Sequence, residues 1–172
     1  MTDTSHKAAS QTLREIASWQ PGRGSADSDL LPELSTMVAR SRDLSRNHGI
    51  ASGAMQTLTD NIVGTGFRLS AKPDYKLLGK TKDWEEEWQA KIEGLWRSWS
   101  ETFMCDAAQS LNFHGLTTQI FKSCLINGEA LALALWLPER PVATTIQLIE
   151  PDRLSNPNNS TDSKNLRGGV EI

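Results

Sequence analysis

Apolar residues recur at helical spacing from about Pro32 onward. A weak apolar face runs from there to Asn47, where His48-Gly49 marks a corner. After the corner, the apolar residues that recur every four positions are Ile50, Ala54, Leu58 and Ile62. These spacings predict two consecutive helices, the second of which is closed by Gly64, because glycine suits the left-handed position after a helix.

The segment from Phe67 to Ala71 changes from helical to alternating spacing. Its apolar residues alternate with Arg68 and Ser70, and Pro73 follows shortly after them. Alternation of this kind is typical of a short strand, and proline ends such a strand. We therefore expect a strand over 67–71.

The strongest helical pattern covers about Asp83 to Ser100. When successive residues are placed 100° apart, one arc of about 120° contains Trp84, Trp88, Ile92, Leu95, Trp96 and Trp99. Each tryptophan can bury roughly 150–250 Å² of surface. This stripe predicts a helix whose four tryptophans supply much of the core.

The second half of the chain combines one more helix with strands. The predicted helix covers about 112–127 and the predicted strands cover 131–136 and 145–149. Gly169 to Ile172 has the pattern of a strand that the chain begins and does not finish. The predicted fold class is α+β, with amphipathic helices packed on a small mixed sheet that is truncated in mid-strand. The strands add Leu131, Leu133 and Trp136 to the predicted core.

Residues 1–30 lack such patterning. They are mostly Ser, Thr, Asp, Gln, Gly and Ala, and proline and glycine interrupt any periodicity. Leu13, Ile16 and Trp19 recur at a spacing of three, which suggests at most one short amphipathic turn. We expect a flexible N-terminal arm over 1–30 and one folded domain over 31–172.

Composition narrows the class of protein without identifying it. Of the 172 residues, 38% are apolar and 23% are charged, which excludes a collagenous, coiled-coil or wholly disordered chain. No apolar run approaches the roughly 20 residues of a spanning helix, so we expect no membrane partner. With 18 basic and 21 acidic residues the formal net charge is -3, which gives no overall attraction to nucleic acid.

The sequence offers no convincing metal or cofactor site. The spacings of Cys105, His114 and Cys124 match no compact zinc site, and a fourth ligand is unassigned. Gly64-Thr65-Gly66 follows a helix and precedes a predicted strand, whereas a phosphate-binding loop needs the reverse order. We therefore expect no cofactor.

Two pairs of carboxylates leave one enzymatic alternative open. Asp106 with Glu129, or Glu150 with Asp152, could divide the acid and base roles of a small hydrolase. Among 21 acidic residues, however, some pairs fall near element ends by chance. No Ser-His-Asp order or nucleophile elbow is present, so we expect a protein that is not an enzyme.

Arg40, Arg42 and Arg46 form the basic cluster of the sequence. Arg42 and Arg46 share a helical face, whereas Arg40 lies about 200° from Arg42 on a helix. Asp43 partly neutralises the group, and no aromatic residues interleave with it as single-strand binders require. The cluster therefore predicts a solvated or subunit-contacting face.

Several motifs follow one another in a specific order. Arg42 to Gly49 leads into a helix that ends Asn61-Ile62-Val63-Gly64, and a tryptophan-rich helix precedes Cys105-Asp106. Asn127-Gly128-Glu129 then opens an apolar strand, and the run from Gln147 to Asn159 follows. In order and spacing, these motifs resemble the opening of lambda-type tailed-phage portal proteins, from about residue 30 onward.

The resemblance implies a structural role without a catalytic site. Portal proteins of this type form a ring, usually a dodecamer, at one capsid vertex, and double-stranded DNA passes through it during packaging and ejection without sequence-specific binding. The implied partners are further copies of the chain, the terminase, scaffold and capsid proteins, and head–tail connector proteins. The implied location is the virion, with the host cytoplasm during assembly.

The resemblance also places the chain within the family's fold. Residues 31–172 correspond to the N-terminal part of the peripheral wing domain, and the stem, clip and crown have no counterpart here. Two interpretations stay open: an N-terminal fragment of a portal protein, or a truncated prophage remnant that folds without assembling. The helices over about 34–63 are expected to contact a neighbouring subunit, with candidate residues Arg40, Arg42, Arg46, Met55 and Leu58.

Overall fold

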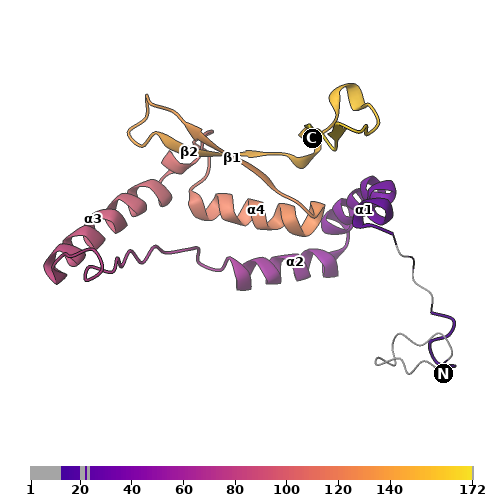
Figure 1. Cartoon of the computed structure of the whole chain (residues 1–172), viewed down its shortest axis with the longest axis horizontal. Coiled ribbons are helices and arrows are strands. Elements are labelled where there is room, and N and C mark those ends of the chain that lie inside the picture. Colours follow the sequence, from indigo (N-terminus) through magenta and orange to yellow (C-terminus); the bar gives the residue numbers. More distant parts are fainter. Residues whose placement is uncertain (1–12, 20–21, 23, 172) are drawn as a thin grey trace. The chain divides into compact units, whose positions relative to one another are not determined.

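The computed structural model describes residues 13–19, 22 and 24–171, and the chain divides into two compact units, Met1–Met37 and Val38–Ile172. In the first unit, residues 13–19 contain a turn in which the Ala17 N–H donates to Leu13 O at 2.8 Å. The boundary between the units falls inside the first helix, α1 (Ala26–Asn47). The second unit holds the remaining elements, whose order is shown in Figure 1.

The two helices predicted on either side of His48-Gly49 are confirmed. α2 (Gly49–Ile62) begins where His48 Nδ1 accepts the Ala51 N–H at 3.3 Å. α1 starts earlier than its apolar pattern predicts, within the residues assigned to the N-terminal arm. The physical reason is a serine cap, because Ser25 Oγ accepts the Ser28 N–H at 3.2 Å.

The strand predicted over 67–71 is wrong. Between α2 and α3 (Lys82–Ser100) the described backbone is irregular, with turns but no strand. Ala71 is buried, and its N–H donates to the Glu93 carboxylate at 3.1 Å rather than to a neighbouring strand. That bond, helped by a second one from Gln89, lowers the pKa of Glu93. The alternating pattern is present, but no strand among the described residues pairs with it.

α3 confirms the predicted tryptophan helix, and its four tryptophans are half-buried in two groups. Trp84 stacks on Trp88 with 6.2 Å between ring centroids. Trp96 and Trp99 both pack on Phe113, at 5.1 and 5.5 Å. Despite these apolar rings, no helix in the described part of the chain is long and apolar enough to cross a membrane.

The next elements of the second unit are the short helix η2 (Phe103–Cys105), α4 (Phe113–Asn127), β1 (Leu131–Trp136) and β2 (Thr144–Ile149). β1 and β2 pair antiparallel, in a register that runs from Leu131↔Ile149 to Trp136↔Thr144. The Trp99 indole N–H donates to Thr144 O at 2.8 Å and so ties α3 to this sheet. The α+β class is confirmed, but the prediction of a mixed sheet is wrong. Apart from one isolated parallel bridge, Asp106 to Ile146, the described strands pair antiparallel.

The best-buried side chains of the second unit belong to η2, α4 and β2: Cys105, Leu116 and Thr145. Two predicted core residues are wrong, because Trp136 is 73% exposed and Leu133 is 43% exposed. Both lie on β1, which has one neighbouring strand among the described residues. A two-stranded sheet leaves much of such side chains in water.

After β2 the chain continues through η3 (Pro151–Arg153), η4 (Pro157–Asn159), β3 (Leu166–Arg167) and β4 (Val170–Glu171). β3 and β4 pair antiparallel, so the strand predicted over 169–172 is confirmed at Val170 and Glu171. Gly169 lies in the turn before β4, and Ile172 lies outside the described residues. Gly169 has a φ of +81°, and a Cβ there would lie 2.7 Å from Ser155 N. Its N–H donates to Asn156 Oδ1 at 2.7 Å, which holds this turn against the loop before it.

Candidate functional site

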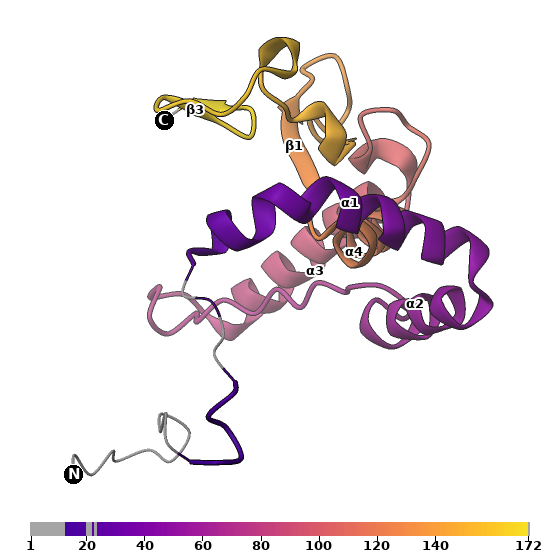
Figure 2. The same ribbon diagram turned by 90° about the vertical axis from the view of Figure 1, so that its right-hand side faces the viewer.

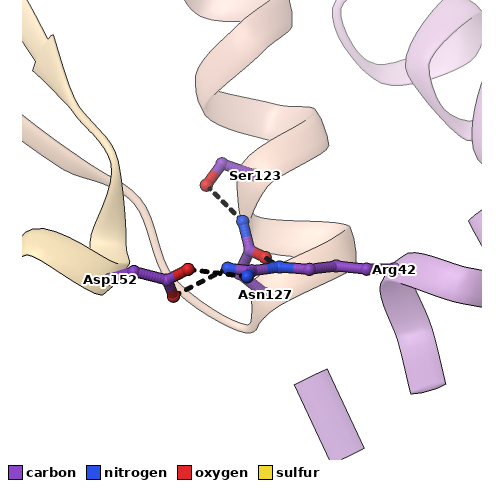
Figure 3. Close-up of polar contacts among 4 residues, drawn as sticks. All are labelled: Arg42, Ser123, Asn127 and Asp152. Carbon is purple, nitrogen blue, oxygen red and sulfur yellow. Dashed lines mark hydrogen bonds and ion pairs between the residues drawn. The ribbon is translucent and has the colours of Figure 1, made fainter. Parts of the chain in front are cut away.

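Arg42, a predicted subunit-contact residue, is bound within its own chain (Figure 3). Its Nη1 and Nη2 donate to the two carboxylate oxygens of Asp152 at 2.6 and 2.8 Å. Its Nε donates to Asn127 Oδ1 at 2.7 Å. Asn127 and Asp152 lie 85 and 110 positions from Arg42 along the chain, so one guanidinium joins α1 to α4 and η3.

Ser123 orients the amide group of Asn127. Asn127 Nδ2 donates to Ser123 Oγ at 3.1 Å, and Ser123 Oγ donates to Glu129 O at 2.8 Å. With Nδ2 turned to the serine, Oδ1 points toward the guanidinium, as Figure 3 shows. We refer to Arg42, Ser123, Asn127 and Asp152 as the Arg42 cluster.

The bidentate pair shifts the protonation equilibria of both partners. Hydrogen bonding to Arg42 lowers the pKa of Asp152, and the same contact raises the pKa of Arg42. The two side chains are 29% and 55% exposed, so solvent screens their attraction and the pair contributes little to the free energy of unfolding. Its planar two-bond geometry instead fixes orientation, which makes the Arg42 cluster a positioning contact for the C-terminal part of α1.

The other four predicted contact residues are distributed over α1 and α2. Arg40 and Arg46 are exposed, and Arg46 Nε donates to the backbone oxygen of Arg42 at 3.1 Å. Leu58 is 44% exposed, whereas Met55 is half-buried. The three arginines therefore do not act as one basic patch, because the Arg42 guanidinium is engaged by Asn127 and Asp152.

α2 carries an exposed apolar stripe along one side. Its members are spaced by four residues, and we refer to them as the α2 stripe: Ile50, Ala54, Leu58 and Ile62. Ile50 is 81% exposed and Ile62 is 56% exposed. α2 packs on α4, and the residues buried at its C-terminal end are Thr59 and Val63. The described residues thus leave an apolar helix face in water, which is typical of an interaction surface.

Asp106, one of the carboxylates considered for hydrolysis, organises a loop. It is 4% exposed, and its oxygens accept the N–H groups of Ala108, Ser110 and Leu111 at 3.0, 2.9 and 3.0 Å. Burial raises the pKa of Asp106, but these hydrogen bonds outweigh burial and the net shift is downward. A carboxylate held in its charged form by backbone donors is a structural group rather than a general acid.

The remaining carboxylates do not complete an acid–base pair. Asp152 is engaged by Arg42, and Glu129 and Glu150 are exposed. Among the residues that the structure describes, no three His, Cys, Asp or Glu side chains are placed to hold a metal ion. The arrangement therefore supports contact between segments rather than hydrolysis.

Asn127 and the role of Asp152 in the Arg42 cluster were not predicted. A signal was nevertheless present, because each of the three bonded residues lies in one of the ordered motifs. Arg42 opens the first motif, Asn127 opens the Asn-Gly-Glu motif, and Asp152 lies in the run from Gln147 to Asn159. Hydrogen bonds between motifs so far apart in the chain indicate that the three motifs hold the same part of the fold together.

Comparison with known proteins confirms the resemblance that these motifs indicated. A family model described as phage portal protein, lambda family, matches residues 12–172. Portal protein B of Escherichia phage lambda is 35% identical over 162 residues, which cover 92% of this chain and 30% of that protein. The portal protein of Escherichia phage N15 is also 35% identical over 162 residues, which cover 92% of this chain and 31% of that protein. The chain thus spans less than a third of the length of these curated relatives.

Proposed function

Because this chain belongs to the lambda family of phage portal proteins, we propose that it supplies part of the ring at one vertex of a phage capsid. The family is structural and non-enzymatic. In this role double-stranded DNA passes through the ring during packaging and ejection, and the terminase and later the head–tail connector proteins bind the ring. The family match over residues 12–172 carries the proposal.

Within such a ring, the chain corresponds to the N-terminal part of the peripheral wing domain. The Arg42 cluster joins three of the motifs on which the resemblance to this family rests, although they are separated by 85 and 110 positions. Motifs that meet in space are expected to be retained together in a common fold. The proposed location is the capsid vertex of the virion, after assembly in the host cytoplasm.

We assign the contact between neighbouring subunits to the α2 stripe, together with the exposed Arg40 and Arg46 of α1. Covering exposed apolar side chains such as Ile50 and Ile62 would remove their surface from water, the main favourable term in association. Arginines are also enriched at protein interfaces. Arg42 drops out of the proposed contact, because its hydrogen bonds are satisfied within the chain.

Electron microscopy and sedimentation of the purified chain test the ring. At high concentration we expect assemblies with rotational symmetry, or arcs of them. The double variant Ile50→Ser/Ile62→Ser is expected to sediment as a monomer, because it removes the two most exposed apolar side chains of α2. Leu77→Ser is the matched control, since Leu77 is 85% exposed but lies outside α2. A wild-type chain that stays a monodisperse monomer at high concentration contradicts the proposal.

A further inference from the structure

We propose that the segment Phe67–Ala71 of one copy of this chain adds as a strand to the outer edge of β1 in a second copy. The inference rests on the ring proposed above and identifies a backbone contact within it. The contact is distinct from the α2 stripe, because it uses the stretch after α2 and the free edge of the sheet.

The segment 67–71 has the sequence of a strand but no strand partner in its own chain. Phe67, Leu69 and Ala71 alternate with Arg68 and Ser70, which favours a strand with two unlike faces. No hydrogen bond joins the backbone of residues 67–70 to any described residue, and Phe67 is 59% exposed. Phe67, Arg68 and Leu69 line a groove of about 600 Å³ together with Trp96 and Phe113, so their own chain does not cover them fully.

β1 has one edge that pairs with no other strand among the described residues. Among the described residues it pairs with β2 alone. Its sequence, Leu-Ala-Leu-Ala-Leu-Trp, contains no charged residue and no proline, although natural proteins protect free edges with such residues. The outer side of β2 is partly occupied, since the Ala107 N–H donates to Ile146 O at 2.9 Å. The edge open to strand addition is therefore that of β1.

The two elements lie where a single copy cannot join them. Figures 1 and 2 both show the stretch between α2 and α3 on one side of α4 and β1 on the other side. Pairing between them must therefore pass from one copy to the next. A contact between two different surfaces of the same chain is heterologous, and heterologous contacts propagate around a ring when the rotation closes. The backbone supplies the hydrogen bonds, and the alternating side chains supply the register.

Disulfide cross-linking tests the contact in the 172-residue chain. In a Cys124→Ser background, which leaves only the fully buried Cys105, Leu69→Cys is combined in turn with Ala132→Cys, Leu133→Cys or Ala134→Cys. Each copy then carries one cysteine on each proposed surface. On oxidation we expect at least one pair to give a ladder of dimers, trimers and larger species, because paired strands bring facing Cβ atoms within disulfide distance.

Two controls separate specific pairing from collision. The single variant Leu69→Cys can give no species larger than a dimer. The mismatched pair Leu77→Cys with Leu133→Cys is expected to give no ladder, although Leu77 is 85% exposed and collides more readily than Leu69. A ladder from the mismatched pair that equals the ladder from the Leu69 pairs overturns the inference.

Ser70→Pro provides a second test that does not depend on cysteines. Proline removes the Ser70 N–H, which bonds to no described residue, so the thermal midpoint of the monomer is expected to stay unchanged. Without that N–H the added strand lacks one hydrogen-bond donor, so Ser70→Pro is expected to weaken association by about tenfold or more. Ser70→Ala keeps the N–H and is expected to associate like wild type. Two results together overturn this contact but leave the ring standing: Ser70→Pro forms symmetric rings as well as wild type does, and the Leu69→Cys pairs give no ladder. A wild-type chain that never associates overturns the ring and this contact together.

Discussion

Asp106 and Asp152 both fix the positions of other segments, but they do so in opposite surroundings. Asp106 is 4% exposed and receives hydrogen bonds from the loop that follows it. The side chain of Asp152 is 55% exposed and receives a guanidinium from 110 positions away. Hydrogen bonds lower the pKa of both, against burial at Asp106. Water can replace the partner of Asp152, so the contact between Asp152 and Arg42 mainly sets the orientation of α1. Water has little access to Asp106, so the hydrogen bonds to Asp106 contribute more to the free energy of unfolding.

The largest loss in the free energy of unfolding is expected when the carboxylate of Asp106 is removed. Asp106→Ala is expected to lower the free energy of unfolding by about 2–4 kcal/mol, because several part-buried N–H groups lose their acceptor together. Chemical denaturation measures this loss. Ser110→Ala is the control, since it removes one hydroxyl bond of 2.8 Å and should cost about 1 kcal/mol. If both variants cost the same small amount, Asp106 does not organise the loop.

Lowering the pH should show how much the charged carboxylate of Asp106 contributes to the free energy of unfolding. Because its folded-state pKa is lowered, the contribution is fully present above the unfolded aspartate pKa of about 3.9 and is lost as the pH falls through the folded-state value. We expect the difference in unfolding free energy between wild type and Asp106→Asn to be constant from about pH 7 to pH 5 and to shrink below about pH 4. Denaturation series across this range measure the difference. A difference that already vanishes between pH 7 and pH 5 would assign the effect to another group.

The smallest effect on stability is expected from Arg42, together with a clear effect on α1. Arg42→Ala should shift the thermal midpoint by at most a few degrees, because the side chains of the pair with Asp152 are 29% and 55% exposed and solvent screens their attraction. Backbone amides of residues 38–47 should nevertheless exchange hydrogen several-fold faster, since the contact that positions this part of α1 is gone. Arg40→Ala is the matched control on the same helix and should leave the exchange unchanged. A loss of stability as large as that of Asp106→Ala would refute the distinction between the two carboxylates.

The helices could be predicted because their signals are local. The α3 tryptophans recur within one helix, and Thr81 and Asn112 accept N–H groups three residues ahead. Gly128 closes α4 with a φ of +83°, a conformation that glycine adopts without strain. The early start of α1 was missed because Ser25 is a cap inside a polar stretch without apolar periodicity.

Strand and core predictions failed where they depended on a partner. Residues 67–71 alternate correctly, but no neighbouring strand pairs with them among the described residues. Trp136 and Leu133 are apolar members of a real strand, yet a sheet of two strands leaves them exposed. An apolar pattern states which side chains favour burial, and it does not supply the surface that buries them.

By itself, the sequence determined the helices, the positions of the strands β1 and β2 and the ordered motifs of the family, because these depend on residues close together in the chain. Only the tertiary structure decided that Arg42 bonds to Asp152 and Asn127, and that the α2 stripe stays exposed while Thr59 and Val63 are buried. These outcomes depend on how helices pack across 85 and 110 positions of chain. Side chains of the same type then meet water, another segment or a second copy according to that packing, which no local pattern encodes.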